Sequence, residues 1–301
     1  RIKSLIDDDG VTHQDHASMA AMATSYFAKL FTADPSLCVD PVIDLIKPRV
    51  SDRMNDGLCA EFSDKEIADA LFQIGPLKAP GPDGFPACFF QRNWDVMRKQ
   101  VIDGVKEFFQ TGIMPEGVNT TSIVLILKVD NSERLTEFRP ISLCNVIYKV
   151  VAKCLVNWLR PILDDIISPE QSAFVPGRMI TDNALIAFEC FHSIQQEKDP
   201  SKSFCAYKYK LDLSKAYDRV DWIFLERMMI KMVFARRWVD WIMACVTSVR
   251  YMVKFNGTLL ESFAPSRGLR QADPLSPFLF LFVADSLSAL LKEGEEKGDF
   301  T

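Results

Sequence analysis

The chain has 301 residues, of which 48% are hydrophobic and 25% are charged, and its formal net charge is −5. This length is enough for two lobes or two domains, and the composition is ordinary for a globular protein. The acidic balance argues mildly against nucleic-acid binding, although it leaves room for a local basic groove. The longest apolar run, residues 278–284, is too short to span a bilayer, and the first residues form no signal-peptide pattern.

The first sixty residues combine a short strand and turn with a helix expected over residues 15–31. His13 and His16 flank the start of that helix, three residues apart. They raise two alternatives, a metal site or a solvated surface, and the lack of a third ligand nearby favours the surface. Residue 1 is Arg and the last residues, EGEEKGDFT, contain no helix stop, so we expect the chain to be an excerpt of a longer one.

Helices and extended segments alternate irregularly from residue 61 to residue 196. Ser63 and Glu66 form a capping box that starts a helix, and the Pro/Gly-rich stretch LKAPGPDGF at 77–85 is a rigid loop. The hydrophobic periodicity then predicts a helix from residue 90, strands at 121–129 and 138–142, and helices at 147–162 and 181–196.

The stretch YKYKLDLSKAYDRVDW, 207–222, alternates apolar and polar residues and then changes period. It predicts a strand with Asp212 at its end, on the polar face. Helices are expected over 221–232 and 236–249, and Asn256-Gly257 between two β-prone runs predicts a hairpin. A helix with Ser276 as N-cap and Pro277 at its first position is apolar nearly all round and therefore buried. The mixed order indicates an α+β fold.

Eight cysteines occur, none in a CxxC pair and none at a zinc-ligand spacing from a histidine. We interpret them as reduced core thiols of an intracellular protein.

Six stretches in order resemble the reverse transcriptase of LINE-type, non-LTR retrotransposons, most of all those of plants: KAPGPDGF, FRPISLCNVIYKVVAK, ISPEQSAFVPGR, ITDNALIAFE, KLDLSKAYDRVDW and SRGLRQADPLSPFLF. The resemblance covers about residues 60–295. It implies the fingers and part of the palm of a right-hand polymerase, without the thumb. Residues 1–60 would be a connector that follows an endonuclease, 61–205 the fingers-like region and 206–301 the partial palm.

By this resemblance Asp212 is the first palm aspartate and binds Mg²⁺ together with the backbone carbonyl of Leu213. Mg²⁺ prefers hard oxygen ligands, and nucleotidyl transfer uses two such ions. The strand alone would instead indicate a solvated charge. Tyr217 matches the aromatic residue under the incoming sugar, which would exclude a 2′-hydroxyl; without the resemblance it would be a half-buried core aromatic. Asp218 and Asp221 are interpreted as structural.

Lys128, Arg139 and Gln271 match residues that contact the nucleotide in relatives. A lysine and a forked arginine suit a triphosphate, although each alone would be an ordinary surface residue. Two positions depart from the family: Leu127 replaces a proline, and Ala272 replaces a glycine. If the backbone at residue 272 has a positive φ, its methyl group would disturb the geometry.

A basic face of the helix at 147–162 is a weaker indication of nucleic-acid binding. Lys149, Lys153 and Arg160 could line a template channel, and a solvated face explains them equally well. The Pro/Gly loop at 78–84 would belong to the fingers, and a rigid turn also accounts for it.

The aromatic-Ala-Asp-Asp box that carries the second carboxylates in this family is absent. Val283-Ala-Asp-Ser286 is the nearest string and matches the helix before that box. We therefore expect an RNA-directed DNA polymerase fragment with RNA template, DNA primer and dNTP as partners, inactive by itself, with its missing carboxylates beyond Thr301. The alternative is a decayed element that at most binds nucleic acid. The family implies nucleus and cytoplasm as its location.

Overall fold

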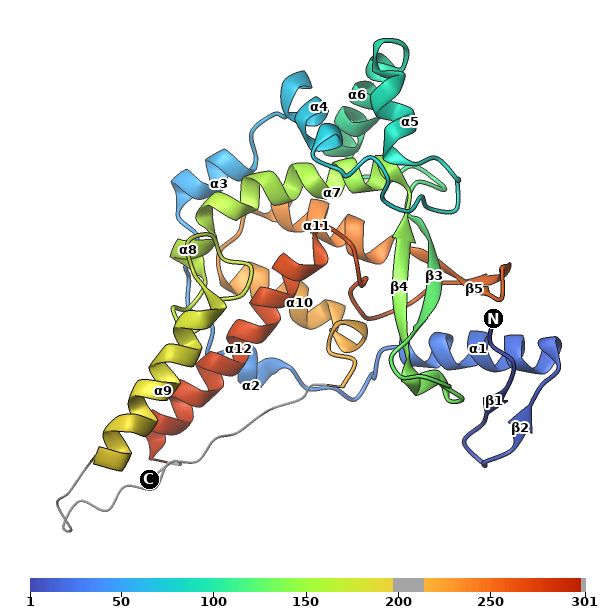
Figure 1. Ribbon diagram of the computed structural model, residues 1–301. Coiled ribbons are helices and arrows are strands. Elements are labelled where there is room, and N and C mark those ends of the chain that lie inside the picture. Colours follow the sequence, from blue (N-terminus) through green and yellow to red (C-terminus); the bar gives the residue numbers. More distant parts are fainter. Residues whose placement is uncertain (197–213, 299–301) are drawn as a thin grey trace.

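A four-stranded sheet of order β4-β3-β5-β6 lies beside a larger body of helices in the structure, a computed structural model that describes residues 1–196 and 214–298 (Figure 1). The strands are β3 (Thr120–Leu127), β4 (Phe138–Cys144), β5 (Arg250–Phe255) and β6 (Thr258–Phe263). Neighbouring strands pair antiparallel except β3 and β5, which run parallel with Ile123 opposite Val253. The predicted α+β class is confirmed.

The hairpin predicted at 250–263 forms as expected. Asn256 has a φ of 49° and Gly257 a φ of 96°, and two consecutive left-handed residues match the right-handed twist of the two strands that they join.

A layer of helices covers one part of the sheet and holds the larger core. Its members are α4 (Asp64–Phe72), α6 (Trp94–Thr111), α7 (Val146–Leu159), α10 (Trp222–Lys231) and α11 (Arg236–Thr247). Trp238, Trp241 and Tyr148 are fully buried within it. The predicted capping box starts α4, where the Ser63 and Glu66 side chains each accept the other's backbone N–H.

Short elements lie between the longer helices and strands. They are α2 (Asp40–Ile43), α3 (Asp52–Leu58), α5 (Ala87–Arg92), α8 (Leu163–Ile166) and the 3-10 turns η1 (Leu135–Glu137), η2 (Arg160–Ile162) and η3 (Tyr217–Arg219).

The N-terminal residues pack against the sheet and form a second core. After the short pair β1 (Leu5–Ile6) and β2 (Thr12–His13), the helix α1 (His16–Leu30) is capped by Asp15, which accepts from the Ser18 N–H at 2.8 Å. Its buried stripe of Met19, Ala23, Phe27 and Leu30 has helical spacing and contacts residues of β5. The segment interpreted as a connector is thus an integral part of the fold.

His13 contacts Asp7, which neither of the two alternatives for the histidines, a metal site or a solvated surface, had predicted. Its Nε2 lies 2.8 Å from Asp7 Oδ2, and both side chains are about three-quarters buried. Within the described ranges no three His, Cys, Asp or Glu residues are grouped as a metal site would require. His13 is therefore held by a local side-chain contact with Asp7.

The helices α9 (Ile180–Gln196) and α12 (Ser276–Lys297) extend toward the same end of the molecule (Figure 1). α9 buries none of its residues. α12 buries residues only as far as Ser286, so the expectation of an entirely buried helix was wrong for its second half. Leu275 is the N-cap rather than Ser276, so the helix begins one residue earlier than expected, and in the turn before it the Asp273 carboxylate accepts from the Leu275 N–H at 2.9 Å.

The thiols divide into two groups. Cys144, Cys154 and Cys245 are buried, as predicted, but Cys38 and Cys190 are exposed, so not all of them belong to the core. Over the part of the chain that is described, no helix has the length and hydrophobicity that crossing a bilayer requires.

Candidate active site

Two segments that are fifty residues apart in the sequence are joined by backbone hydrogen bonds. The Leu269 N–H donates to the Tyr217 carbonyl at 2.7 Å, and the Gly268 N–H donates to the Val220 carbonyl at 2.7 Å. Gly268 has a φ of +97°, and a Cβ there would lie 2.8 Å from the Asp218 carbonyl oxygen. Glycine is thus required for the approach that brings Tyr217 and Gln271 into one site.

Tyr217 occupies the first position of η3 and is half-buried. Its ring stacks on that of Phe280 with a centroid distance of 4.7 Å and an interplanar angle of 15°. Burial raises the pKa of its hydroxyl. The ring is therefore rigidly placed, as a steric role toward a sugar would need, and it also serves as the core aromatic of the alternative interpretation.

Gln271 is anchored through both its backbone and its side chain. Its carbonyl accepts from the Ser142 N–H of β4 at 3.0 Å, and its Nε2 donates to Asp218 Oδ1 at 2.9 Å. Ala272 follows with a φ of +74°. The backbone at residue 272 thus has the positive φ at which a methyl group was expected to disturb the geometry. Alanine stands where this backbone conformation favours glycine.

A buried charged network lies directly beneath Gln271, and the sequence analysis missed it. Arg270, which is 4% exposed, donates through Nε to Asp273 Oδ2 at 2.9 Å and through Nη2 to the Cys245 carbonyl at 2.9 Å. Its guanidinium lies 3.8 Å from the centroid of the Tyr148 ring, whose hydroxyl also donates to Asp273. The i, i+3 spacing of Arg270 and Asp273 was the feature of the sequence that could have predicted this ion pair. A fully paired network of this kind holds the segment in one conformation.

The β3–β4 hairpin carries the two cations expected at a triphosphate. Arg139 pairs with Ile126, and Lys128 follows β3 directly and donates its backbone N–H to the Glu137 carbonyl at 2.9 Å, so both cations belong to this hairpin. Lys128 Nζ donates to the Thr136 carbonyl at 3.1 Å, and Arg139 is exposed. Leu127 continues the strand opposite Phe138, so its replacement of the family's proline leaves the pairing of this hairpin regular.

The basic face expected on α7 is not a single surface. Lys149 is 8% exposed and its Nζ donates to the Ala79 carbonyl at 2.9 Å; burial lowers the pKa of its ammonium group. It therefore does not lie on a solvated face, so that alternative was wrong for Lys149, and its expected place in a template channel remains a prediction. Lys153 is partly buried and Arg160 is exposed.

The Pro/Gly loop at 78–84 is fixed to the start of α7. Asn145 accepts from the Asp83 N–H at 3.3 Å and donates to the Gly117 carbonyl at 3.0 Å. A Cβ at Gly81 would lie 2.1 Å from Asn145 Oδ1, so this glycine permits the contact. Together with Lys149, these contacts make the loop a rigid part of the fold.

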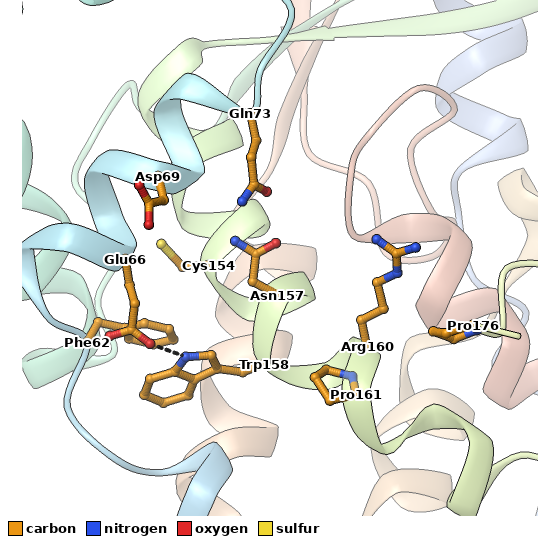
Figure 2. Close-up of a pocket in the computed structure, with 10 residues that line it drawn as sticks. All are labelled: Phe62, Glu66, Asp69, Gln73, Cys154, Asn157, Trp158, Arg160, Pro161 and Pro176. Atoms are coloured by element: carbon orange, nitrogen blue, oxygen red, sulfur yellow. Dashed lines mark hydrogen bonds between the residues drawn. The ribbon is translucent and has the colours of Figure 1, made fainter.

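A cavity of about 510 Å³ lies between α4 and α7. Figure 2 shows the Gln73 and Asn157 side-chain amides close to one another on its wall, and the hydrogen bond of 2.7 Å from Trp158 Nε1 to Glu66 Oε1. Arg160 lines the same cavity. It shares no residue with the group around Tyr217 and Gln271.

The carboxylates near Gln271 do not form a free metal-binding pair. Asp218 accepts from Gln271, and Asp273 accepts from Arg270 and Tyr148. Asp212 and Leu213, the residues predicted to bind the metal, lie outside the described residues. Asp285 of the VADS string is 1% exposed and pairs with Arg49 Nη1 at 2.6 Å, which makes it a structural residue of α12.

Comparison with known proteins assigns the class. The profile of the family described as reverse transcriptase (RNA-dependent DNA polymerase) matches residues 126–297, and the chain belongs to this family. Such enzymes generally use divalent metal ions and act on an RNA template, a primer and nucleotides.

The relatives indicate the type within the family. The chain is 30% identical to the transposon TX1 uncharacterized 149 kDa protein of Xenopus laevis over 97% of its own length and 22% of that protein. It is 24% identical to the Pol polyprotein of the type-2 retrotransposable element R2DM of Drosophila melanogaster, over 95% of its own length and 25% of the relative. It is also 49% identical over 43 residues to the uncharacterized mitochondrial protein AtMg01250 of Arabidopsis thaliana, which covers 14% of the chain and 35% of that protein.

The chain spans about a quarter of the length of the TX1 and R2DM proteins. It is an RNA-directed DNA polymerase domain of the non-LTR retrotransposon type. The plant affinity suggested by the motifs remains a prediction.

Proposed function

We propose that residues 61–205 are the fingers and 206–301 the first part of the palm of a polymerase that copies RNA into DNA, with the thumb outside this stretch. The observation that carries the proposal is the backbone pairing of the Tyr217 segment with the Gln271 segment, directly beside β4. It gathers residues from three distant stretches at one place.

The described residues would bind and select the nucleotide. Lys128 and Arg139, which both belong to the hairpin, supply the point charge and the fork that a triphosphate needs. Tyr217, held by its stack on Phe280, would block a 2′-hydroxyl and so select a dNTP. Gln271 would contact the nucleotide from the opposite segment.

Asp212 and the carbonyl of Leu213 would hold Mg²⁺, whose chemistry is to stabilise charge on the attacking and leaving oxygens. No aromatic-Ala-Asp-Asp box occurs in residues 1–301. Because Mg²⁺ in such a site needs more than one carboxylate, we expect a polypeptide limited to residues 1–301 to incorporate no dNTP.

The test compares this polypeptide with one from the same reading frame that continues through such a box. Primer extension on an RNA template is expected only from the longer chain, and Asp212→Asn in it should lower the rate at least about a hundredfold, the scale of losing a key electrostatic group. Asp165→Asn, an exposed carboxylate of α8, is the matched control and should leave the rate unchanged. Robust incorporation by residues 1–301 alone would overturn the proposal.

A second candidate function is nucleic-acid binding without catalysis, in the nucleus or cytoplasm. The positive φ at Ala272 favours it, because this backbone would impair a nucleotide site that glycine would fit. A reading frame that stops before a second carboxylate box would support it. Binding to an RNA–DNA duplex should then weaken with salt, with a log–log slope that corresponds to several phosphate contacts.

A further inference from the structure

The hydrogen bond between Gln271 and Asp218 limits how the glutamine amide can point. A carboxylate accepts hydrogen bonds and does not donate them, so the amide nitrogen Nε2 must face Asp218. The observed distance of 2.9 Å from Nε2 to Oδ1 fits this arrangement. If the amide were rotated by half a turn, its oxygen would face the carboxylate oxygen, and the two acceptors would repel.

Both ends of this contact are fixed to the backbone framework. Asp218 is 1% exposed and sits in η3, whose flanking carbonyls at Tyr217 and Val220 accept from Leu269 and Gly268. Gln271 is tied to β4 through its own carbonyl. Because both backbones are fixed, the hydrogen bond between the two side chains determines the orientation of the Gln271 amide.

The surroundings of Asp218 argue that its carboxylate is not retained for stability. Its second oxygen, Oδ2, is buried and has no hydrogen-bond partner within the described residues. The charged groups that act on it are Lys215, Lys128 and Arg219, but none forms a hydrogen bond with it there. A buried acceptor without a partner is unfavourable for folding, and such sites are common where function requires them.

We propose that Asp218 is a positioning residue: it turns the Gln271 amide so that the oxygen Oε1 is the atom offered to the nucleotide. The inference rests on the proposed function and deepens it. Because Asp218 holds one of the two N–H groups of Nε2, Oε1 faces away from the carboxylate and can accept from a donor on the nucleotide, such as a sugar hydroxyl or a base amino group, while the second N–H stays available to donate.

The first experiment follows the contact with Asp218, by the ¹H–¹⁵N resonances of the Gln271 side-chain amide in residues 1–301. These resonances are identified by their loss in Gln271→Met. Asp218→Ala should shift them to the positions of a solvated glutamine, whereas Arg219→Ala, which removes a neighbouring exposed charge but not the contact, should leave them in place. Unchanged resonances in Asp218→Ala would overturn the inference, and thermal unfolding of each variant shows whether it is folded.

The second experiment measures the affinity of the same variants for dTTP with Mg²⁺. Asp218→Ala and Gln271→Met should each weaken binding about tenfold, the scale of one lost hydrogen bond to a charged group. The double variant should be no weaker than Gln271→Met, because Asp218 acts only through Gln271. Asp218→Asn keeps an acceptor but also adds a donor, so it should bind with intermediate affinity.

Two failures can be told apart. If the wild-type chain binds no dTTP, the proposed nucleotide site fails, and the assignment of Oε1 to a nucleotide fails with it. The wild type could instead bind dTTP while the losses of binding free energy in Asp218→Ala and Gln271→Met add up in the double variant. In that case the proposed function stands and the positioning role of Asp218 is refuted.

Discussion

Ala272 holds a backbone conformation that suits glycine, with a φ of +74°. A Cβ in this region clashes with the backbone at a cost of about 1–2 kcal/mol, and glycine avoids that clash but loses more entropy on folding. We therefore expect Ala272→Gly to raise the free energy of unfolding by about 0.5–1 kcal/mol. Ala289→Gly, within α12, should lower it by about 0.5–1 kcal/mol, because glycine is a poor helix former.

Urea denaturation of both variants measures these changes. An equal loss of stability in the two would show that residue 272 does not adopt the left-handed conformation.

Asp218 gives a pH dependence to stability. Burial raises the pKa of its carboxyl above the ordinary value of 3.8, and the Gln271 hydrogen bond and the cation of Lys215 oppose this only in part. The folded state therefore binds a proton more readily than the unfolded state, so the contribution of Asp218 to stability falls as the pH rises above about 4.

Asp218→Asn removes this penalty. It should raise the free energy of unfolding at pH 7, and its advantage over the wild type should shrink as the pH approaches 4. Denaturation midpoints across pH 4–7 measure the difference, and an advantage that is independent of pH would contradict the assignment to Asp218.

The motifs marked two segments that pair in the structure, since the Leu269 N–H, two residues before Gln271, donates to the Tyr217 carbonyl. The nucleotide-binding roles that the resemblance implies for Tyr217 and Gln271 remain predictions. Asp218 was interpreted as structural because nothing local points to its partner, which lies 53 residues further along the chain. Lys149 was misjudged for the same reason, since the carbonyl that it contacts belongs to a loop 70 residues earlier.

At the scale of elements, the contact between the η3 segment and the strand-like segment before Gln271 depends on one glycine. A Cβ at Gly268 would lie 2.7 Å from Phe31 Cδ1 as well as 2.8 Å from the Asp218 carbonyl, and the φ of +97° adds strain. We expect Gly268→Ala to lower the free energy of unfolding by about 2–4 kcal/mol, as overpacking and backbone strain combine.

Gly104 provides the matched comparison. It lies within α6, and a Cβ there would have no heavy atom within 4 Å. Gly104→Ala should raise stability by about 0.5–1 kcal/mol through helix propensity. Similar effects of the two substitutions in chemical denaturation would refute the close approach at Gly268.

Elements with a local signal were predicted closely. The Ser63 capping box and the Asn256-Gly257 turn depend on neighbours within a few residues, and both are confirmed. The start of α12 was misplaced by one residue, because the helix begins at Ser276 with Leu275 as N-cap and has no side-chain cap that the sequence could mark. The parallel pairing of β3 with β5 was not predicted, since neither strand's sequence specifies so distant a partner.

At the scale of the whole molecule, exposed apolar side chains are concentrated on α9. Ile180, Leu185, Ile186 and Phe188 are each 61–71% exposed. Contiguous apolar surface of this kind promotes association between molecules. We expect the double substitution Ile186→Lys with Phe188→Glu to reduce concentration-dependent light scattering without lowering the unfolding temperature.

Val96→Glu is the control for this prediction, because Val96 is 76% exposed on α6, away from α9. It should leave the scattering unchanged. If it lowered the scattering as much as the α9 substitutions did, the loss of any exposed apolar side chain, rather than the apolar surface of α9, would be responsible.

The parallel pairing of β3 with β5 also has a consequence for biosynthesis. β4 ends at Cys144, and β5 begins only at Arg250. A ribosome that adds about 5–20 residues per second needs roughly 5–20 s to make that stretch. During this interval one edge of β3 has no partner and is open to pairing with other chains. Nascent chains halted before residue 250 should therefore bind chaperones that recognise extended apolar segments, and should lose that binding once β5 has emerged.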